Sequence, residues 1–172
     1  MGRDPKWENF AQLTARCYKA AENGNTLNGC WNEAFNALMD VIAQERRTDS
    51  GFARELGDLE KITDFKFNIV GLVLDYFDWL WREGDYQTIC TNADRVINTF
   101  DWHVESSSAI RIKVVKSLVE MGKKDEAMQY CLEWIKAEPE DVNAAMTKKA
   151  LLADTEMLKN TMLADTEGEE KC

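Results

Sequence analysis

The sequence is poor in the residues on which several kinds of chemistry depend. It has one histidine, His103, and none of its five cysteines stands in a Cys-x-x-Cys pair. A zinc site that needs two histidines is therefore excluded, and no motif places a nucleophile beside His103. Its nine glycines stand singly, so no glycine-rich phosphate loop is present. We expect no catalytic residue, no metal site and no cofactor, and therefore a protein that is not an enzyme.

Proline and long apolar runs are also scarce. The chain has two prolines, and apolar residues do not alternate with polar ones over any long segment, as they would in half-buried strands. With 45% hydrophobic residues, the composition favours an all-α globular protein. The longest apolar region, Ile69 to Trp81, is broken by Asp75 and Asp78 and is too short to span a bilayer. The first ten residues have no apolar signal-peptide core, and we expect no membrane partner.

Basic residues are fewer than acidic ones. The chain has 31 acidic and 21 basic residues, a net charge of −10. Proteins that bind nucleic acid directly present a basic face, so we expect no direct nucleic-acid partner and no attraction to an anionic membrane. Acidity suits a protein that binds other proteins. It also suits a small inhibitor that imitates nucleic acid.

The cysteines are odd in number, and no two lie closer than 13 residues. Cys17, Cys90 and Cys131 occupy apolar positions of expected helices, where a free cysteine acts as a small core residue. We therefore expect reduced thiols and a cytoplasmic location.

Helical periodicity and turn residues predict about seven antiparallel helices. Asp4 and Pro5 are typical of a helix start, and Thr63-Asp64 is a candidate N-cap for the most apolar helix. The expected helices span residues 5–22, 28–47, 65–83, 86–99, 104–121, 124–137 and a last one from Pro139 to Glu167, with a short helix at 52–59.

A pattern built on a turn glycine occurs three times, after Gly29, Gly84 and Gly122. Each glycine is followed by small or apolar residues five, nine, twelve and thirteen positions later. Glycine permits the tight turn between two helices, and the later residues fill the core of the hairpin.

This pattern resembles the tetratricopeptide repeat, a helix-turn-helix unit of 34 residues. The best copy is 108–141, where Gly122, Ala127 and Pro139 stand at the family's turn, small-residue and closing-proline positions. The copy at 70–103 keeps Gly84 and Tyr86 but has Ile89 and Asp101 at the small-residue and proline positions. The resemblance implies a stack of helical hairpins, an α-solenoid, whereas a four-helix bundle is the simpler alternative.

We expect one helical domain spanning residues 1–172. It divides into a degenerate hairpin (1–47), an irregular connector (48–64), two repeat-like hairpins (65–141), a capping helix (142–167) and a tail (168–172). The segment Leu-Ala-Asp-Thr-Glu occurs at 152–156 and again at 163–167, a spacing of three helical turns that places both on one face. The alternative to a cap is a C-terminal helix that pairs with a second chain in a homodimer.

In the resembled family, the first helix of each hairpin lines a groove that holds peptides. The polar stripe of the apolar helix, Asp75, Asp78 and Arg82, would lie on that surface beside Leu74 and Trp81. The next hairpin would add Ile112, Lys113, Lys116 and Glu120. Leu74 and Ile112 stand where the family's carboxylate clamp has lysines, so we expect a basic or aromatic ligand instead. The alternative is that the stripe is an internal salt-bridged seam.

These observations favour a non-enzymatic adaptor that binds a protein or peptide. The alternative is a small acidic inhibitor, a nucleic-acid mimic or an immunity-type protein that blocks a basic enzyme.

Overall fold

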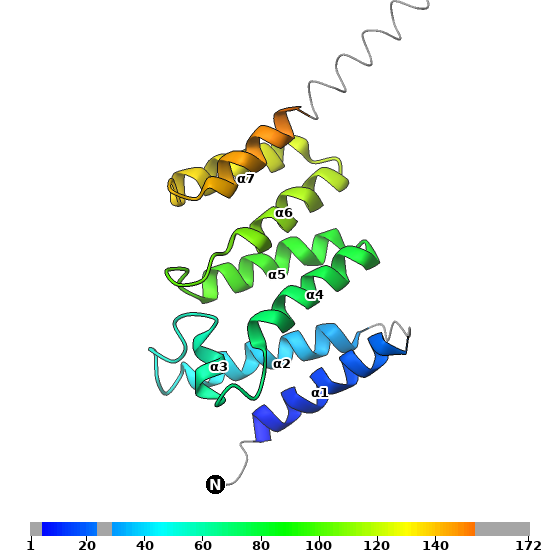
Figure 1. The fold of residues 1–172 in the computed structure, drawn as a ribbon, viewed down its shortest axis with the longest axis vertical. Coiled ribbons are helices and arrows are strands. Elements are labelled where there is room, and N and C mark those ends of the chain that lie inside the picture. The colour runs from blue at the N-terminus through cyan, green and yellow to red at the C-terminus, as the bar shows by residue number, and fades with distance from the viewer. Residues whose placement is uncertain (1–4, 24–28, 154–172) are drawn as a thin grey trace, which may run out of the picture. The chain divides into compact units, whose positions relative to one another are not determined.

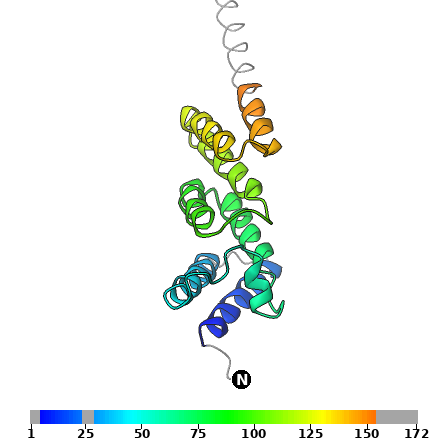
Figure 2. The ribbon, with the colours of Figure 1, turned by 90° about the vertical axis from the view of Figure 1, so that its left-hand side faces the viewer.

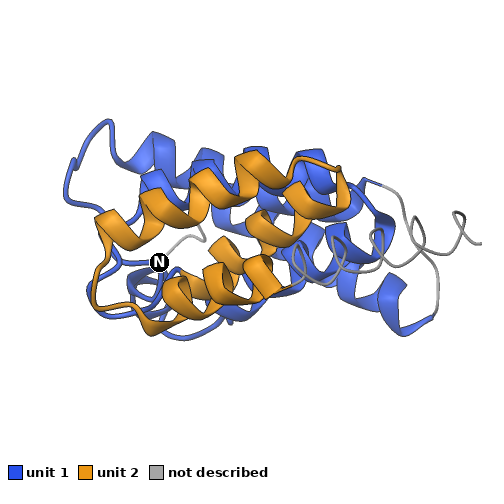
Figure 3. Ribbon diagram, turned by 90° about the horizontal axis from the view of Figure 1, so that it is seen from above, with its two compact units in different colours: residues 1–107 blue, residues 108–172 orange. Residues whose placement is uncertain are grey.

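The computed structural model describes residues 5–23 and 29–153 of the chain (Figures 1 and 2). Throughout these residues the only regular structure is helical, which confirms the all-α class. The chain forms two compact units, Met1–Ser107 and Ser108–Cys172 (Figure 3). No helix in the described ranges has the length and apolar character needed to cross a membrane.

The first unit is built around its most apolar helix, α4. It contains α1 (Pro5–Glu22), α2 (Cys30–Glu45), α3 (Asp58–Ile62), α4 (Ile69–Glu83) and α5 (Tyr86–Thr99). Helix α1 packs on α2, while α4 packs on α2, α3 and α5. A helix that is apolar on most of its surface needs such neighbours on several sides. Its buried residues are Ile69, Leu72, Val73, Tyr76, Phe77, Trp79 and Leu80.

The second unit contains a hairpin of α6 (Ser108–Glu120) and α7 (Lys124–Ala137), followed by a helical segment at 142–153. Pro139 lies in a turn, so the expectation that it opens the last helix is wrong. Asp141 begins that helix instead, because its carboxylate accepts a hydrogen bond from the backbone N–H of Asn143 at 2.9 Å. The rest of the expected capping helix, from residue 154, lies outside the described residues.

Two turn glycines behave as the repeat pattern predicts. Gly84 and Gly122 have φ angles of 71° and 75°, in the left-handed region that residues with a Cβ rarely adopt. After the first turn, the Asp85 carboxylate accepts the backbone N–H of Thr88 at 3.2 Å. Helices α5 and α7 consequently have the predicted bounds.

Three predicted helix boundaries are wrong. Helix α4 begins at Ile69 rather than 65, because Asp64 and Phe65 adopt φ angles of 53° and 55° that end the preceding helix. Asn68, not Thr63-Asp64, caps α4, and its side chain accepts the Gly71 N–H at 2.9 Å. The short helix expected at 52–59 is α3, at Asp58–Ile62, and α6 begins at Ser108 rather than 104.

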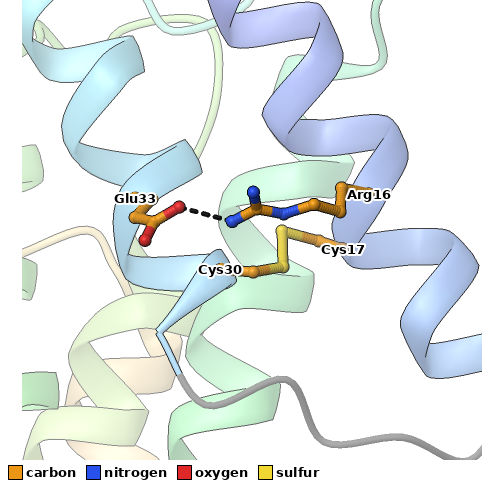
Figure 4. The surroundings of a disulfide bond; sticks show 4 residues. All are labelled: Arg16, Cys17, Cys30 and Glu33. Atoms are coloured by element: carbon orange, nitrogen blue, oxygen red, sulfur yellow. Dashed lines mark hydrogen bonds and ion pairs between the residues drawn. A yellow bond between two sulfur atoms is a disulfide. The ribbon is translucent and has the colours of Figure 1, made fainter.

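Cys17 and Cys30 form a disulfide, which corrects the expectation that all the thiols are free (Figure 4). Their Cα atoms are 5.7 Å apart, within the usual range for a disulfide. The bond joins α1 to α2, beside an ion pair between Arg16 and Glu33 at 2.5 Å. Cys90 and Cys131 keep their thiols.

We expect the disulfide to stabilise the first unit. Closing a loop of this length restricts the unfolded chain and is worth about 3 kcal/mol. Adding a reductant should therefore lower the unfolding free energy of the wild type by about that amount. A Cys17→Ala, Cys30→Ala variant should show no such response, whereas Cys90→Ala should respond as the wild type does. Denaturant unfolding with and without reductant measures the effect, and a wild type that is insensitive to reductant would contradict it.

Candidate functional site

The five candidate residues on α4 lie along one side of this helix. Leu74, Asp75, Asp78 and Arg82 are exposed, and Trp81 is half-buried. The Trp81 ring lies 5.2 Å from the ring of Tyr86, measured between centroids. Arg82 donates a hydrogen bond from Nε to the backbone carbonyl of Asp78 at 3.4 Å. The stripe predicted from sequence is thus a surface feature of the first unit as described.

The other four candidates belong to the second unit. On α6, Ile112 and Lys113 are half-buried, whereas Lys116 and Glu120 are exposed. Val114, Val115 and Leu118 of the same helix are buried in the core of this unit.

Asp75 is the candidate residue that both forms a hydrogen bond to another helix and lines a cavity. Its Oδ2 accepts a hydrogen bond of 2.6 Å from the hydroxyl of Tyr18, which lies 57 residues earlier on α1. Burial raises the pKa of Tyr18, and the hydrogen bond to Asp75 and the carboxylate charge raise it further. Tyr18 therefore stays protonated at neutral pH and holds the Asp75 carboxylate as a hydrogen-bond donor.

A cavity of about 400 Å³ opens beside this pair. That volume is within the range of about 300–1,000 Å³ typical of ligand sites. Helix α1, the segment before α4, and α4 itself all contribute to its lining. The lining residues are Phe10, Thr14, Tyr18, Lys66, Phe67, Asn68, Leu72 and Asp75.

Aromatic rings form one wall of the cavity. Phe67 stacks on Trp7 with the ring centroids 6.1 Å apart and the planes at 12°. Phe10, which is fully buried, meets Phe67 edge-on at 5.4 Å. Sequence reasoning missed this wall because it assigned Phe65 to Phe67 to a helix, whereas the chain there is an irregular segment that turns Phe67 towards α1.

A polar network runs from the buried Tyr76 to the exposed Asn36 and Arg95 of the first unit. The hydroxyl of Tyr76 donates to Oδ1 of Asn32 at 2.6 Å and accepts from Nδ2 of Asn92 at 2.6 Å. Arg95 donates to Oδ1 of Asn92 at 3.2 Å and to Oδ1 of Asn36 at 2.9 Å. The network joins α2, α4 and α5, so its role is to fix how these helices pack.

The buried Tyr76 hydroxyl makes stability depend on pH. Burial raises its pKa from 10.0 to about 12, although the hydrogen bond from Asn92 acts in the opposite direction. Because the folded pKa is the higher one, this contribution is complete below about pH 10 and is lost as the pH rises to about 12. We expect the wild type to lose more unfolding free energy than Tyr76→Phe between about pH 9 and 11.5. Denaturant unfolding at both pH values tests this, and equal losses would contradict it.

The site offers few groups for catalysis. No set of three or more His, Cys, Asp or Glu side chains in the described part of the chain could hold a metal ion. Asp75 is hydrogen-bonded to the Tyr18 hydroxyl, and the lining also contains the Thr14 hydroxyl but no His or Cys. The arrangement can bind a ligand by charge, hydrogen bonds and stacking.

No protein-family model matches this chain, and neither does any curated protein or solved structure. The resemblance to tetratricopeptide repeats therefore rests on the residues of the chain itself.

Proposed function

We propose that this protein is a non-enzymatic adaptor with tetratricopeptide-like hairpins and that it binds a protein or peptide on the face containing Asp75. The cavity between α1 and the start of α4 carries this proposal, since it adjoins the residue that the sequence pattern selects. The turn glycines at 84 and 122 and the bounds of α5 and α7 support the repeat-like arrangement.

The proposed surface combines features of protein-binding sites. Leu74 is an apolar side chain that is 38% exposed, and Trp81 is a half-buried aromatic residue. Asp75 and Asp78 add negative charge to the same helix. Aromatic anchors with a few polar groups are typical of binding hot spots.

The candidate residues of α6 belong to the second unit and are proposed as a contact surface of that unit. Lys116 and Glu120 are both exposed and lie one turn apart. The proposal gives α6 protein or peptide contacts of its own, so Lys116→Glu should weaken capture of a partner that binds the second unit.

The proposed location is the cytoplasm, and the disulfide argues against it. Cytosolic thiols are kept reduced, whereas disulfides persist in oxidising compartments. Alkylation of the unfolded protein under non-reducing conditions decides the matter, because reduced Cys17 and Cys30 become labelled, whereas disulfide-bonded cysteines do not.

The acidic-inhibitor alternative is supported by the net charge of −10. It requires a basic enzyme as the partner and a steep loss of binding as salt rises. If the protein still binds its partner at high salt, the acidic-inhibitor alternative is wrong.

A homodimer through the C-terminal helix is a further alternative. Val142 and Met146, one turn apart, are 68% and 63% exposed. The mass of the protein in solution distinguishes a dimer from a monomer.

We expect reversal of the stripe charges to abolish partner capture without unfolding the chain. Asp75 and Asp78 are exposed, so Asp75→Lys, Asp78→Lys should stay folded and lower the melting temperature only by the loss of the Tyr18–Asp75 hydrogen bond. Bait proteins would be incubated with nuclease-treated lysate. A protein whose captured amount is at least tenfold lower with the variant than with the wild type would be identified as the ligand of this face.

A matched control carries the same change of charge elsewhere. Asp40→Lys, Asp94→Lys alters exposed carboxylates on α2 and α5, and it should retain the partners. Equal capture by all three baits would refute the proposed face. Unfolding of the stripe variant would support the internal-seam alternative.

A further inference from the structure

The cavity beside Asp75 is lined by a carboxylate, two hydroxyl groups, an amide and one lysine. We propose that it receives an arginine side chain of the partner, an inference that rests on the proposed function and specifies its ligand. The occupant would place its guanidinium group against Asp75 and the aromatic wall.

Acceptor atoms come from four lining residues. Asp75 uses Oδ2 for Tyr18, and within the described structure its Oδ1 accepts no hydrogen bond. Thr14 Oγ1 is buried and has no hydrogen-bond partner among the described residues. Asn68 Oδ1 accepts the Gly71 N–H and keeps a second lone pair, and the Tyr18 oxygen can also accept.

An orphaned buried hydroxyl favours a ligand that supplies a partner for it. Leaving a buried polar atom unpaired costs about 1–3 kcal/mol, which a bound donor would recover. Guanidinium has five N–H donors, which suit the oxygens of Asp75, Thr14 and Asn68. A carboxylate ligand would place its negative charge against that of Asp75.

The aromatic wall distinguishes arginine from lysine. A guanidinium group is planar, weakly hydrated and able to stack on an aromatic ring while its edge donates hydrogen bonds. Phe67 is half-buried and is the lining ring available for stacking, whereas Phe10, at 80° to it, is fully buried. A lysine ammonium would be a point charge with only three donors.

Lys66 is the one cationic side chain in the lining, and substituting it tests whether the ligand is positively or negatively charged. Its side chain is exposed, and the net charge of −10 over the whole chain favours a cationic ligand. For an arginine ligand, Lys66→Met removes a repulsion and should strengthen binding about threefold, the effect of one exposed charge. For an anionic ligand, the same substitution should weaken binding.

The experiment titrates the full-length chain with two probes, Nα-acetyl-arginine amide and the neutral, similarly shaped Nα-acetyl-citrulline amide, followed by NMR. We expect shifts at Thr14, Phe67 and Asp75 with the arginine probe, and binding of the citrulline probe that is about tenfold weaker. Asp75→Asn should weaken the arginine probe about tenfold, since asparagine still accepts the Tyr18 hydroxyl but has no charge. The control Asp40→Asn, at an exposed position of α2 outside the cavity lining, should leave its binding unchanged.

Three results would overturn the inference: no binding of the arginine probe, equal binding of both probes, or no effect of Asp75→Asn. If the arginine probe fails but the charge-reversed stripe still loses a lysate partner, the adaptor function stands and the arginine assignment falls. If both experiments fail, both proposals fall.

Discussion

Tyr76→Ala is expected to lower the unfolding free energy of the first unit by about 4 kcal/mol. The side chain is fully buried, and its ring stacks on Phe35 with the centroids 4.4 Å apart. Truncation leaves a cavity at the centre of α2, α4 and α5. It also removes the hydroxyl shared by Asn32 and Asn92, which leaves two amide groups without that partner. Because whole domains are stable by only about 5–15 kcal/mol, this is a large fraction of the total.

Tyr76→Phe is the matched control. It keeps the stacked ring and removes only the hydroxyl, so it should cost about 1–2 kcal/mol. Denaturant unfolding followed by circular dichroism gives both values. A Tyr76→Ala variant within about 1 kcal/mol of the wild type would show that this network does not organise the first unit.

Trp134→Ala is expected to destabilise the second unit by about 3–5 kcal/mol. Trp134 is 1% exposed, and the Arg111 guanidinium lies over its ring at 5.9 Å from the centroid. Arg111 also pairs with Glu138 at 2.9 Å. Loss of the indole therefore opens the α6–α7 core and removes the ring on which Arg111 rests.

Amide hydrogen exchange across residues 108–137 measures the loss of stability in the second unit, where Trp134 lies. Leu132→Ala, on the same helix but 42% exposed, is the control and should change stability by no more than about 0.5 kcal/mol. Equal exchange in the two variants would contradict the assignment of Trp134 to the core.

Elements bounded by local signals were predictable from the sequence. Gly84 and Gly122 end the helices before them because they adopt the left-handed region, and α5 and α7 begin shortly after. The start of α4 was not predictable in this way. Phe65 and Phe67 continue the apolar pattern of the helix, yet Asp64 and Phe65 break it with positive φ angles.

The candidate site also has one residue that a local sequence pattern predicts and others that no local pattern predicts. Asp75 stands out in the sequence as a charged position on an otherwise apolar helix. Its partner Tyr18 and the wall residue Phe67 come from other segments, and no local pattern encodes their approach. The Cys17–Cys30 disulfide was missed for a related reason, because both cysteines fit the core positions of their own helices.

The most direct test of the account is a hydrogen-exchange footprint of the wild-type chain with and without a captured partner. We expect slower amide exchange on binding in residues 10–18 of α1 and in residues 66–78, which include the first part of α4. Protection confined to α5, or to the exposed apolar side chains at 142–153, would contradict it and place the binding surface elsewhere.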